Sequence, residues 1–203
     1  MCPSGAGAEG LTEADHATFM RRAIELSEKG GIHEKVGGAA RPRPAAPAAP
    51  AAPAAAAHPA RHPRPRAGCF GAVIVDAATK QIVGEGYNHV ISSHDPTWHG
   101  EVGAIRDASA RLQRHHLTGC VLYTSAEPCP MCYCASQWAR IDAIYYAASY
   151  ADVKTYGNFD DENFLVELAK PAAERAVPCR QMLRGEAVEV WKKFAEMPDK
   201  VHY

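Results

Sequence analysis

The sequence lacks the features that mark membrane-spanning and secreted proteins. It contains no apolar run that approaches the roughly 18 to 20 residues needed for a transmembrane helix. Residues 1–15 offer neither a basic start nor a hydrophobic segment, so no secretory signal is expected. These absences predict a soluble protein of the cytoplasm that has no membrane partner.

Acidic residues and large apolar side chains are both missing from residues 39–67. Every one of these 29 positions is Ala, Pro, Arg or His. Such a segment cannot bury enough surface to offset the entropy of ordering it. We therefore expect a disordered insertion here, within a single domain over residues 12–203 that follows a flexible N-terminus over residues 1–11.

An excess of positive charge is also absent from the rest of the chain. The tract holds five of the 22 Lys and Arg residues and none of the 23 Asp and Glu residues, so the remainder has a net charge of −6, against −1 for the whole chain. A dedicated phosphate-backbone binder needs a basic face. The composition therefore predicts no nucleic-acid partner.

Cysteine is present, but in a number that does not suit a disulfide framework. The seven cysteines are an odd number, in a chain too long to need disulfide bridges for stability. We expect reduced thiols, some of which serve a metal site or catalysis.

Hydrophobic periodicity predicts strands that alternate with helices. Helices are expected over 12–29, over the segment from Val102 to Leu112, from Pro130 onward and over 186–196; strands are expected over 70–75, 81–87, 120–124 and 143–147. The first two strands read as a hairpin. Strands separated by helices imply a partly parallel sheet with helices on both of its faces.

One cysteine pair has the spacing of a half metal site. Cys129 and Cys132 stand at the start of a predicted helix, which puts both sulfurs on one face, and the positive helix end favours their thiolate forms. Alone, the pair could be redox-active, structural or a chance occurrence. The sequence offers no second pair at a spacing that would close a four-cysteine zinc site.

His99 and Glu101 give the cysteine pair a specific interpretation. Two thiolates and one imidazole leave the fourth tetrahedral position of Zn²⁺ open to water, which is the arrangement of a catalytic site. Glu101 follows His99 by two residues on a predicted first helical turn. Side chains at this spacing point in different directions, so we do not expect Glu101 to bind the same metal ion. We expect it to carry protons instead. His-x-Glu followed by Pro-Cys-x-x-Cys is the known signature of zinc nucleobase deaminases.

These motifs resemble the cytidine/cytosine-type zinc deaminase superfamily, and within it the guanine deaminases. The resemblance covers nearly all of the chain except residues 1–14 and the insertion, and includes the segments FGAVIV (70–75), DPTWHGEV (95–102), LYTSAEPCPMC (122–132) and FDD (159–161). It implies an α/β fold of the three-layer α/β/α type, with a central mixed sheet of about five strands. It also implies a zinc-dependent hydrolase that converts guanine to xanthine and ammonia.

The resemblance further assigns roles to individual residues. His99, Cys129 and Cys132 would bind zinc, and Glu101 would be the proton shuttle. Other assignments concern the substrate: Asn88 would bind the purine, Asp161 would act near the departing amino group, and Tyr203 would close the pocket from the exchanged C-terminal tail of a partner in a homodimer. Trp98, which departs from the family pattern, would reshape the base pocket.

Other interpretations remain open from the residues alone. Asn88 could merely hold a turn, and Asp161 could be an exposed helix cap. His89 and His94 precede His99 at five-residue steps and could suggest a histidine metal array, but they fall in a polar loop and are expected to be solvated. The substrate could be guanosine or a cytosine-type base, and the non-enzymatic alternative is a zinc-stabilised binding module, which would have no use for Glu101.

Overall fold

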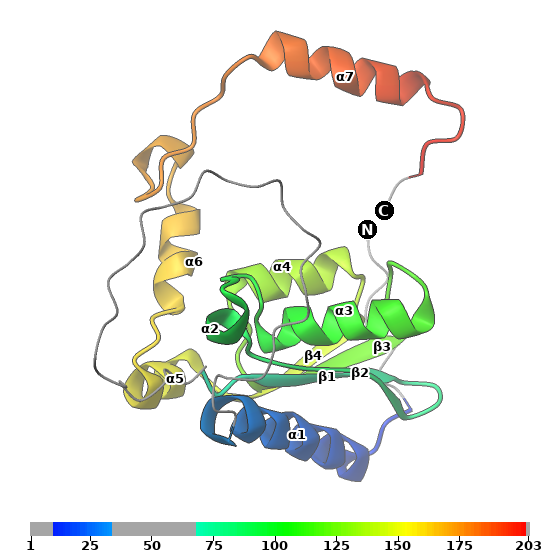
Figure 1. The fold of residues 1–203 in the computed structure, drawn as a ribbon, viewed down its shortest axis with the longest axis vertical. Helices are drawn as coiled ribbons and strands as arrows, with labels where there is room; N and C mark the ends of the chain where they lie inside the picture. Colours follow the sequence, from blue (N-terminus) through cyan, green and yellow to red (C-terminus); the bar gives the residue numbers. More distant parts are fainter. Residues whose placement is uncertain (1–9, 34–67, 202–203) are drawn as a thin grey trace, which may run out of the picture.

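The computed structural model describes residues 10–33 and 68–201, which form an α/β fold around one mixed sheet (Figure 1). Its four strands are β1 (Gly71–Asp76), β2 (Gln81–Tyr87), β3 (Cys120–Ala126) and β4 (Ala143–Ala148), in the spatial order β2-β1-β3-β4. β1 is antiparallel to β2 and β3, whereas β3 and β4 are parallel. The predicted hairpin and the parallel pair are therefore present.

The described residues form four strands, so the expected count of about five is not reached within them. After β4 the chain forms α5 (Tyr150–Gly157) and α6 (Glu162–Ala169) and adds no further strand to the sheet. A parallel neighbour of β4 would require a crossover that returns to the sheet edge. In the described residues, the sheet ends at β4.

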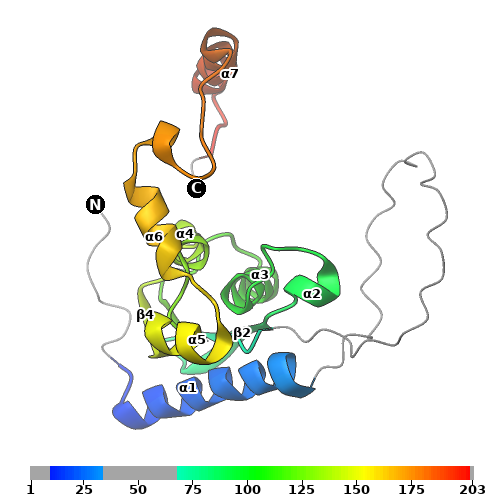
Figure 2. The same cartoon turned by 90° about the vertical axis from the view of Figure 1, so that its left-hand side faces the viewer.

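Helices cover both faces of the sheet. α1 (Glu13–Glu28) lies on one face, while α3 (Gly100–Leu112) and α4 (Pro130–Trp138) lie on the other (Figures 1 and 2). A short helix, α2 (Val90–Ser93), interrupts the loop between β2 and α3. The layering agrees with the fold class that the sequence predicts.

The first helix forms where its capping signal and its periodicity predict it. The Thr12 side chain accepts a hydrogen bond from the backbone N–H of Asp15, and the Asp15 carboxylate accepts from the backbone N–H of Thr12. This reciprocal capping box satisfies two amide groups that the first turn would otherwise leave without partners. Phe19, Ala23 and Leu26 are the buried apolar side chains of the helix and pack against the sheet.

Two apolar clusters fill the space on the two sides of the sheet. Val73, Val75, Val121 and Tyr123 face α1, while Ala72, Ile74, Leu122 and the alanines of α3 form the other cluster. β3 is buried along its whole length because it is an interior strand with helices on both faces. The core therefore fixes the strand ends from which the site loops depart.

The C-terminal part of the chain extends away from this body. α6, a short 3₁₀ turn (Ala172–Glu174) and α7 (Arg184–Glu196) follow one another outside the sheet layers (Figures 1 and 2). α7 confirms the helix predicted over 186–196, although Trp191 and Val190 on it are exposed. Within the described ranges, no helix combines the length and the apolar character needed to cross a bilayer.

Candidate metal centre

The three predicted zinc ligands meet at one end of the sheet. His99 is the N-cap of α3, Cys129 is the N-cap of α4, and Cys132 lies in the first turn of α4. The loops that carry them follow β2 and β3. These strands end together because Tyr87 of β2 is opposite Gly71, next to the Ala72–Thr124 pair of β1 and β3.

Local sequence explains why each ligand stands at a helix start. Pro130 occupies the first helical position of α4, where its missing N–H is not needed and its fixed φ suits the helix. Gly100 opens α3 in a place where a Cβ atom would approach the backbone oxygen of Phe70 to 2.9 Å. A larger residue at position 100 would push the start of α3, and His99 with it, away from β1.

The donor atoms have the spacing that zinc requires. One ligand atom from each of His99, Cys129 and Cys132 lies within 4.8 Å of the others, and the Cys129 sulfur is 3.6 Å from Nδ1 of His99. Zn–S and Zn–N bonds of about 2.3 and 2.0 Å at tetrahedral angles place sulfur and nitrogen about 3.5 Å apart. No other such group of three occurs among the residues that the structure describes. The residues present therefore fit a zinc ion with three protein ligands.

The electrostatics of the two thiols favour a negatively charged donor set. A hydrogen bond from the Cys132 thiol lowers the pKa of Cys129 to about 4, and the same bond raises the pKa of Cys132. The neighbouring Cys129 sulfur raises the pKa of His99 through their hydrogen bond. Both cysteines are buried, so the negative charge on their sulfurs needs a positive partner. A metal cation bound between them would take the place of the proton that they share.

Glu101 lies in the first turn of α3 with its side chain almost completely buried. It is 4% exposed, and burial is the main cause that raises the pKa of its carboxyl group. The charge of Cys129 raises this pKa further, because a second negative charge nearby disfavours ionisation. Burial and the neighbouring thiolate thus both favour the protonated form of the carboxyl group beside the thiols of the candidate metal site.

The structure places Asn88 and Asp161 around the same end of the sheet. Asn88 is buried immediately after β2, and its side-chain oxygen accepts a hydrogen bond from the backbone N–H of Val90. The turn-holding alternative for Asn88 thus has a structural basis. Asp161 is the N-cap residue of α6 but makes no capping hydrogen bond, and the pKa of its carboxyl group is raised by burial and by the charge of Cys129.

Sequence reasoning missed two aromatic residues at this site. The rings of Phe70 and His99 are nearly parallel with centroids 6.4 Å apart, and Phe159 meets Phe70 edge-on at 5.1 Å. Both residues belong to segments that carry the family resemblance, FGAVIV and FDD. The signal was therefore present, although it did not show that the two segments meet beside the metal ligands.

A further pair of contacts holds the loop that carries Cys129. The Tyr150 hydroxyl donates a hydrogen bond to the backbone carbonyl of Pro128, and the Glu127 carboxylate accepts one from the backbone N–H of Tyr150. Burial raises the pKa of Tyr150 to about 12, so its hydroxyl stays protonated and able to donate. These contacts connect α5 to the residue before the first thiol.

Trp98 and Tyr203 are the remaining residues that the sequence singles out. The Trp98 ring lies next to the ring of His89, in a groove lined by α1, β2 and α3. His89 is half-buried there, whereas His94 is exposed, and neither belongs to the group of possible metal donors among the described residues. Tyr203 lies outside the described residues.

Comparisons with known proteins agree with this geometry. Residues 51–148 match the family model described as the cytidine and deoxycytidylate deaminase zinc-binding region. The guanine deaminase of Bacillus subtilis (strain 168) is 38% identical over 184 residues, which are 89% of this chain and 96% of the relative. A tRNA-specific adenosine deaminase of Haemophilus influenzae is 36% identical over 117 residues, which are 56% of this chain and 67% of that protein.

A solved structure extends the similarity to the fold. The X-ray structure of guanine deaminase from Bacillus subtilis matches with a TM-score of 0.72 at 36% identity, and covers 93% of this chain and 98% of that one. The chain belongs to the zinc-dependent deaminase family, a family of hydrolytic enzymes. Among its relatives, the similarity to guanine deaminase spans nearly the full length.

Proposed function

We propose that this protein is a zinc-dependent guanine deaminase, which hydrolyses guanine to xanthine and ammonia. The observation that carries the proposal is a buried carboxyl group, Glu101, beside three metal donors that leave one tetrahedral position for a non-protein ligand. A structural zinc site would have four protein ligands and no use for such a carboxyl group.

His99, Cys129 and Cys132 would hold the zinc ion. When bound, zinc supplies an activated water nucleophile at neutral pH and a positive charge near the reacting carbon. The N-termini of α3 and α4 point their backbone N–H groups toward the donor set. We expect these helix ends to stabilise the negative charge that gathers there during the reaction.

Glu101 would move the protons. Its carboxylate takes the proton of the attacking water and gives it to a ring nitrogen of guanine as the bond to C2 forms. The same group then delivers the second water proton to the amino nitrogen, which leaves as ammonia when the C2–N bond breaks. Burial supports this role because it brings the pKa of the carboxyl group closer to the working pH.

Four side chains would orient the base. Phe70 and Phe159 offer apolar rings next to His99, against which a purine would stack. Asn88 would hydrogen-bond the purine edge, and Asp161 would receive the departing amino group. Trp98 would influence the pocket through its peptide bond to His99.

The substitution Glu101→Gln tests the assignment of the proton shuttle. We expect kcat for ammonia release from guanine to fall by about 10²- to 10⁴-fold, because the amide cannot exchange the proton. Zinc content, measured by atomic emission, should stay at one ion per chain. Glu13→Gln, at an exposed position of α1, is the matched control and should keep full activity. Near-full activity of zinc-loaded Glu101→Gln would remove the residue from this role.

A substrate panel separates guanine from the alternatives. Ammonia release would be compared for guanine, guanosine, cytosine, adenine and ammeline at equal zinc loading. Turnover of guanosine alone would contradict the free-base proposal, and no turnover at all would favour a zinc-stabilised binding module. The shorter matches to tRNA-specific adenosine deaminases make free guanine the better-supported substrate.

The active form would be a cytoplasmic homodimer with exchanged C-terminal tails that serves purine breakdown. This part of the proposal is supported by the apolar side chains that α6 and α7 leave exposed, such as Phe164, Val166 and Trp191. Tyr203 would enter the partner's pocket from the end of the tail. A free base needs no nucleic-acid or membrane partner.

A further inference from the structure

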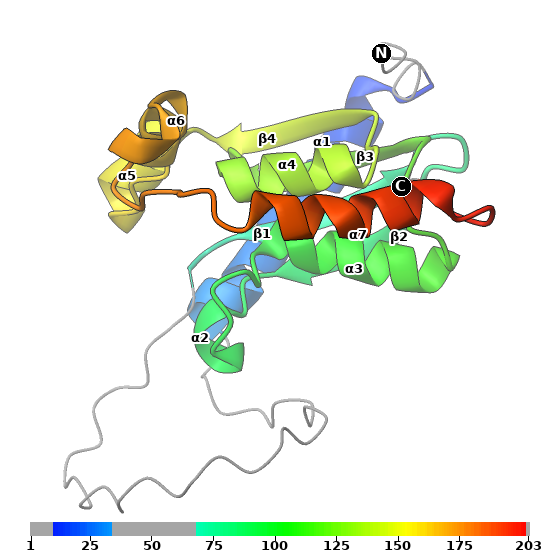
Figure 3. The ribbon, with the colours of Figure 1, turned by 90° about the horizontal axis from the view of Figure 1, so that it is seen from above.

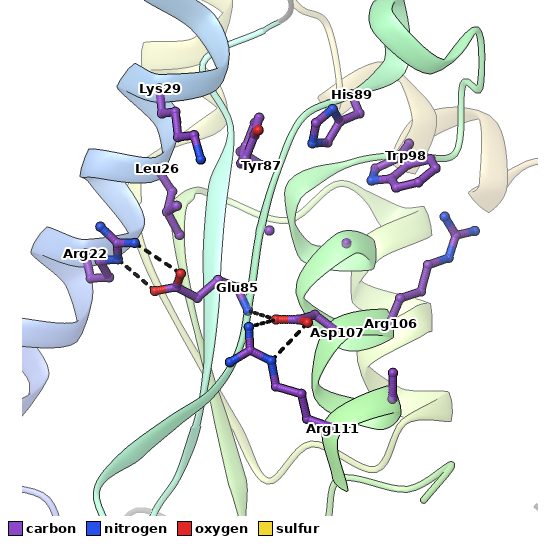
Figure 4. A pocket seen from close by; sticks show the side chains of 13 residues that line it. Arg22, Leu26, Lys29, Glu85, Tyr87, His89, Trp98, Arg106, Asp107 and Arg111 are labelled. Atoms are coloured by element: carbon purple, nitrogen blue, oxygen red, sulfur yellow. Dashed lines mark hydrogen bonds and ion pairs between the residues drawn. The ribbon is translucent and has the colours of Figure 1, made fainter. Parts of the chain in front are cut away.

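A cavity lies at the β2 edge of the sheet, apart from the three proposed metal ligands. It has a volume of about 500 Å³ and is lined by α1, β2, the loop before α3, and α3 itself (Figure 4). None of His99, Cys129 and Cys132 lines it. We call this cavity the edge groove.

One wall of the edge groove is a row of aromatic rings. The ring centroids of Tyr87 and His89 are 4.3 Å apart, and those of His89 and Trp98 are 5.5 Å apart with the planes at 63°. All three residues are half-buried. Figure 4 shows them side by side across one end of the groove. Faces of this kind suit a planar aromatic ligand.

Two cations flank the aromatic row, Lys29 directly after the end of α1 and Arg106 on α3. The ammonium nitrogen of Lys29 lies 4.9 Å from the Tyr87 ring centroid, and the guanidinium of Arg106 lies 5.4 Å from that of Trp98. Within the described part of the chain, neither cation forms an ion pair. Their charges are therefore available to an anion that enters the groove.

The remaining charges of the groove are already paired. Arg22 makes two hydrogen bonds to the Glu85 carboxylate, at 2.7 and 3.1 Å, and Arg111 pairs with Asp107 at 2.7 Å. These pairs neutralise one another along the floor and leave the excess positive charge to Lys29 and Arg106 (Figure 4). The groove thus combines stacking surfaces with two free cations.

We propose that the edge groove binds a nucleoside phosphate, with its base on the aromatic row and its phosphate on one of the two flanking cations, Lys29 or Arg106. The volume lies within the range of about 300 to 1,000 Å³ that small-molecule sites occupy. A single nucleotide fits better than a nucleic-acid strand, because the chain outside residues 39–67 carries net negative charge.

The position of the groove relates the nucleotide to the metal centre. Tyr87 directly precedes Asn88, and Trp98 directly precedes His99. A ligand that contacts both rings therefore touches the neighbours of a metal ligand and of a proposed base-binding residue. The groove would bind the nucleotide whichever base is deaminated at the metal centre.

Isothermal titration of the full-length, zinc-loaded protein with adenosine 5′-monophosphate tests the proposal. We expect a dissociation constant at least tenfold lower than for inorganic phosphate or for adenosine, because each of these probes uses only half of the groove. Equal affinity for phosphate alone would overturn the nucleotide assignment. Binding of a single-stranded oligonucleotide without binding of the mononucleotide would also overturn it.

Substitution of the two cations locates the site. In Lys29→Gln/Arg106→Gln we expect the dissociation constant of adenosine 5′-monophosphate to rise by at least tenfold, with an unchanged thermal unfolding midpoint. Arg21→Gln removes one charge from an exposed position of α1 that does not line the groove, and should bind as the unmodified protein does. An unchanged constant in the double variant would show that the nucleotide binds elsewhere. If the double variant does not fold, each single variant is tested instead. Lys29→Gln alters only an exposed side chain.

Discussion

At the scale of single residues, Gly86 determines how closely α3 approaches the sheet. A Cβ atom at this position would lie 2.3 Å from the backbone oxygen of Gly100 and 2.4 Å from the backbone nitrogen of Ala104. Both atoms belong to α3, whose N-cap is His99, so neither can move without displacing this proposed metal ligand. The absence of a side chain here is thus a condition for the metal centre.

The substitution Gly86→Ala should therefore destabilise the protein. Overpacking against helix backbone costs about 1 to 3 kcal/mol, and we expect a loss of this size in the free energy of unfolding measured with urea. Zinc affinity should fall as well, because His99 moves. Gly185→Ala has no atom within 4 Å of the new methyl group and, because alanine also favours the helix, should lower neither quantity. Equal stability of the two variants would contradict the close packing of α3.

Single residues also show how far the sequence predicts the site. The sequence can single out His99, Cys129, Cys132 and Glu101 as candidates because coordination chemistry demands particular side chains at particular spacings, and the structure brings the three donor atoms together. The aromatic pair Phe70 and Phe159 carries no such spacing. Ring contacts depend on where two distant loops meet, which only the folded chain determines.

At the scale of elements, β2 is the edge strand of the sheet and its free backbone groups need other partners. The side chain of Asp107, from α3, accepts a hydrogen bond from the backbone N–H of Glu85 at 3.0 Å. It also accepts one from Arg111. A helix side chain thus takes the place of a neighbouring strand and covers part of an exposed edge.

Removal of this contact should weaken the edge. For Asp107→Ala we expect the free energy of unfolding to fall by about 1 to 2 kcal/mol, since the Glu85 amide loses its acceptor. Arg111→Gln removes only a largely exposed ion pair, for which less than about 1 kcal/mol is expected. Urea denaturation of both variants measures the difference. A larger loss in Arg111→Gln would show that the ion pair, and not the amide contact, matters.

The elements also differ in how well the sequence predicts them. α1, α3 and α4 show helical periodicity because one side of each packs on the sheet, and alternation or apolar runs mark the strands for a similar reason. α2 spans four residues, and α5 and α6 span eight residues each, so these helices are shorter than the window over which a helical period can be recognised in a sequence. The edge groove could not be predicted from the sequence either, because Lys29 and Arg106 belong to elements on opposite faces of the sheet and only the fold brings them to one groove.

At the scale of the whole molecule, the C-terminal helices leave much apolar surface uncovered. Val190 and Trp191 on α7 are 66% and 68% exposed, and Phe164 and Val166 on α6 are each more than half exposed. In Figure 3 the chain from α6 to α7 crosses above the sheet layers, and Figure 1 shows that α7 stands apart from them. Exposed apolar side chains gathered on helices are typical of surfaces that another chain covers. A second copy of the chain, as proposed above, would cover it.

The substitution Val190→Asp tests the proposed dimer. An aspartate at this exposed position costs an isolated chain little, but a dimer interface would bury its charge. We expect multi-angle light scattering to give the mass of two chains for the unmodified protein and of one chain for the variant. Lys193→Asp, on the polar side of α7, should remain dimeric. A monomeric mass for the unmodified protein would refute the exchange of tails.

The sheet directions give the molecule a working end and an opposite end. β1 begins beside Phe70, which stacks on His99, and ends at the turn over residues 77–80. Six residues of strand separate the two ends by about 20 Å. Ala78 in that turn is exposed. A fluorophore or a solid support attached at Ala78 would hold the protein by its far side and leave the entrance for the base unobstructed.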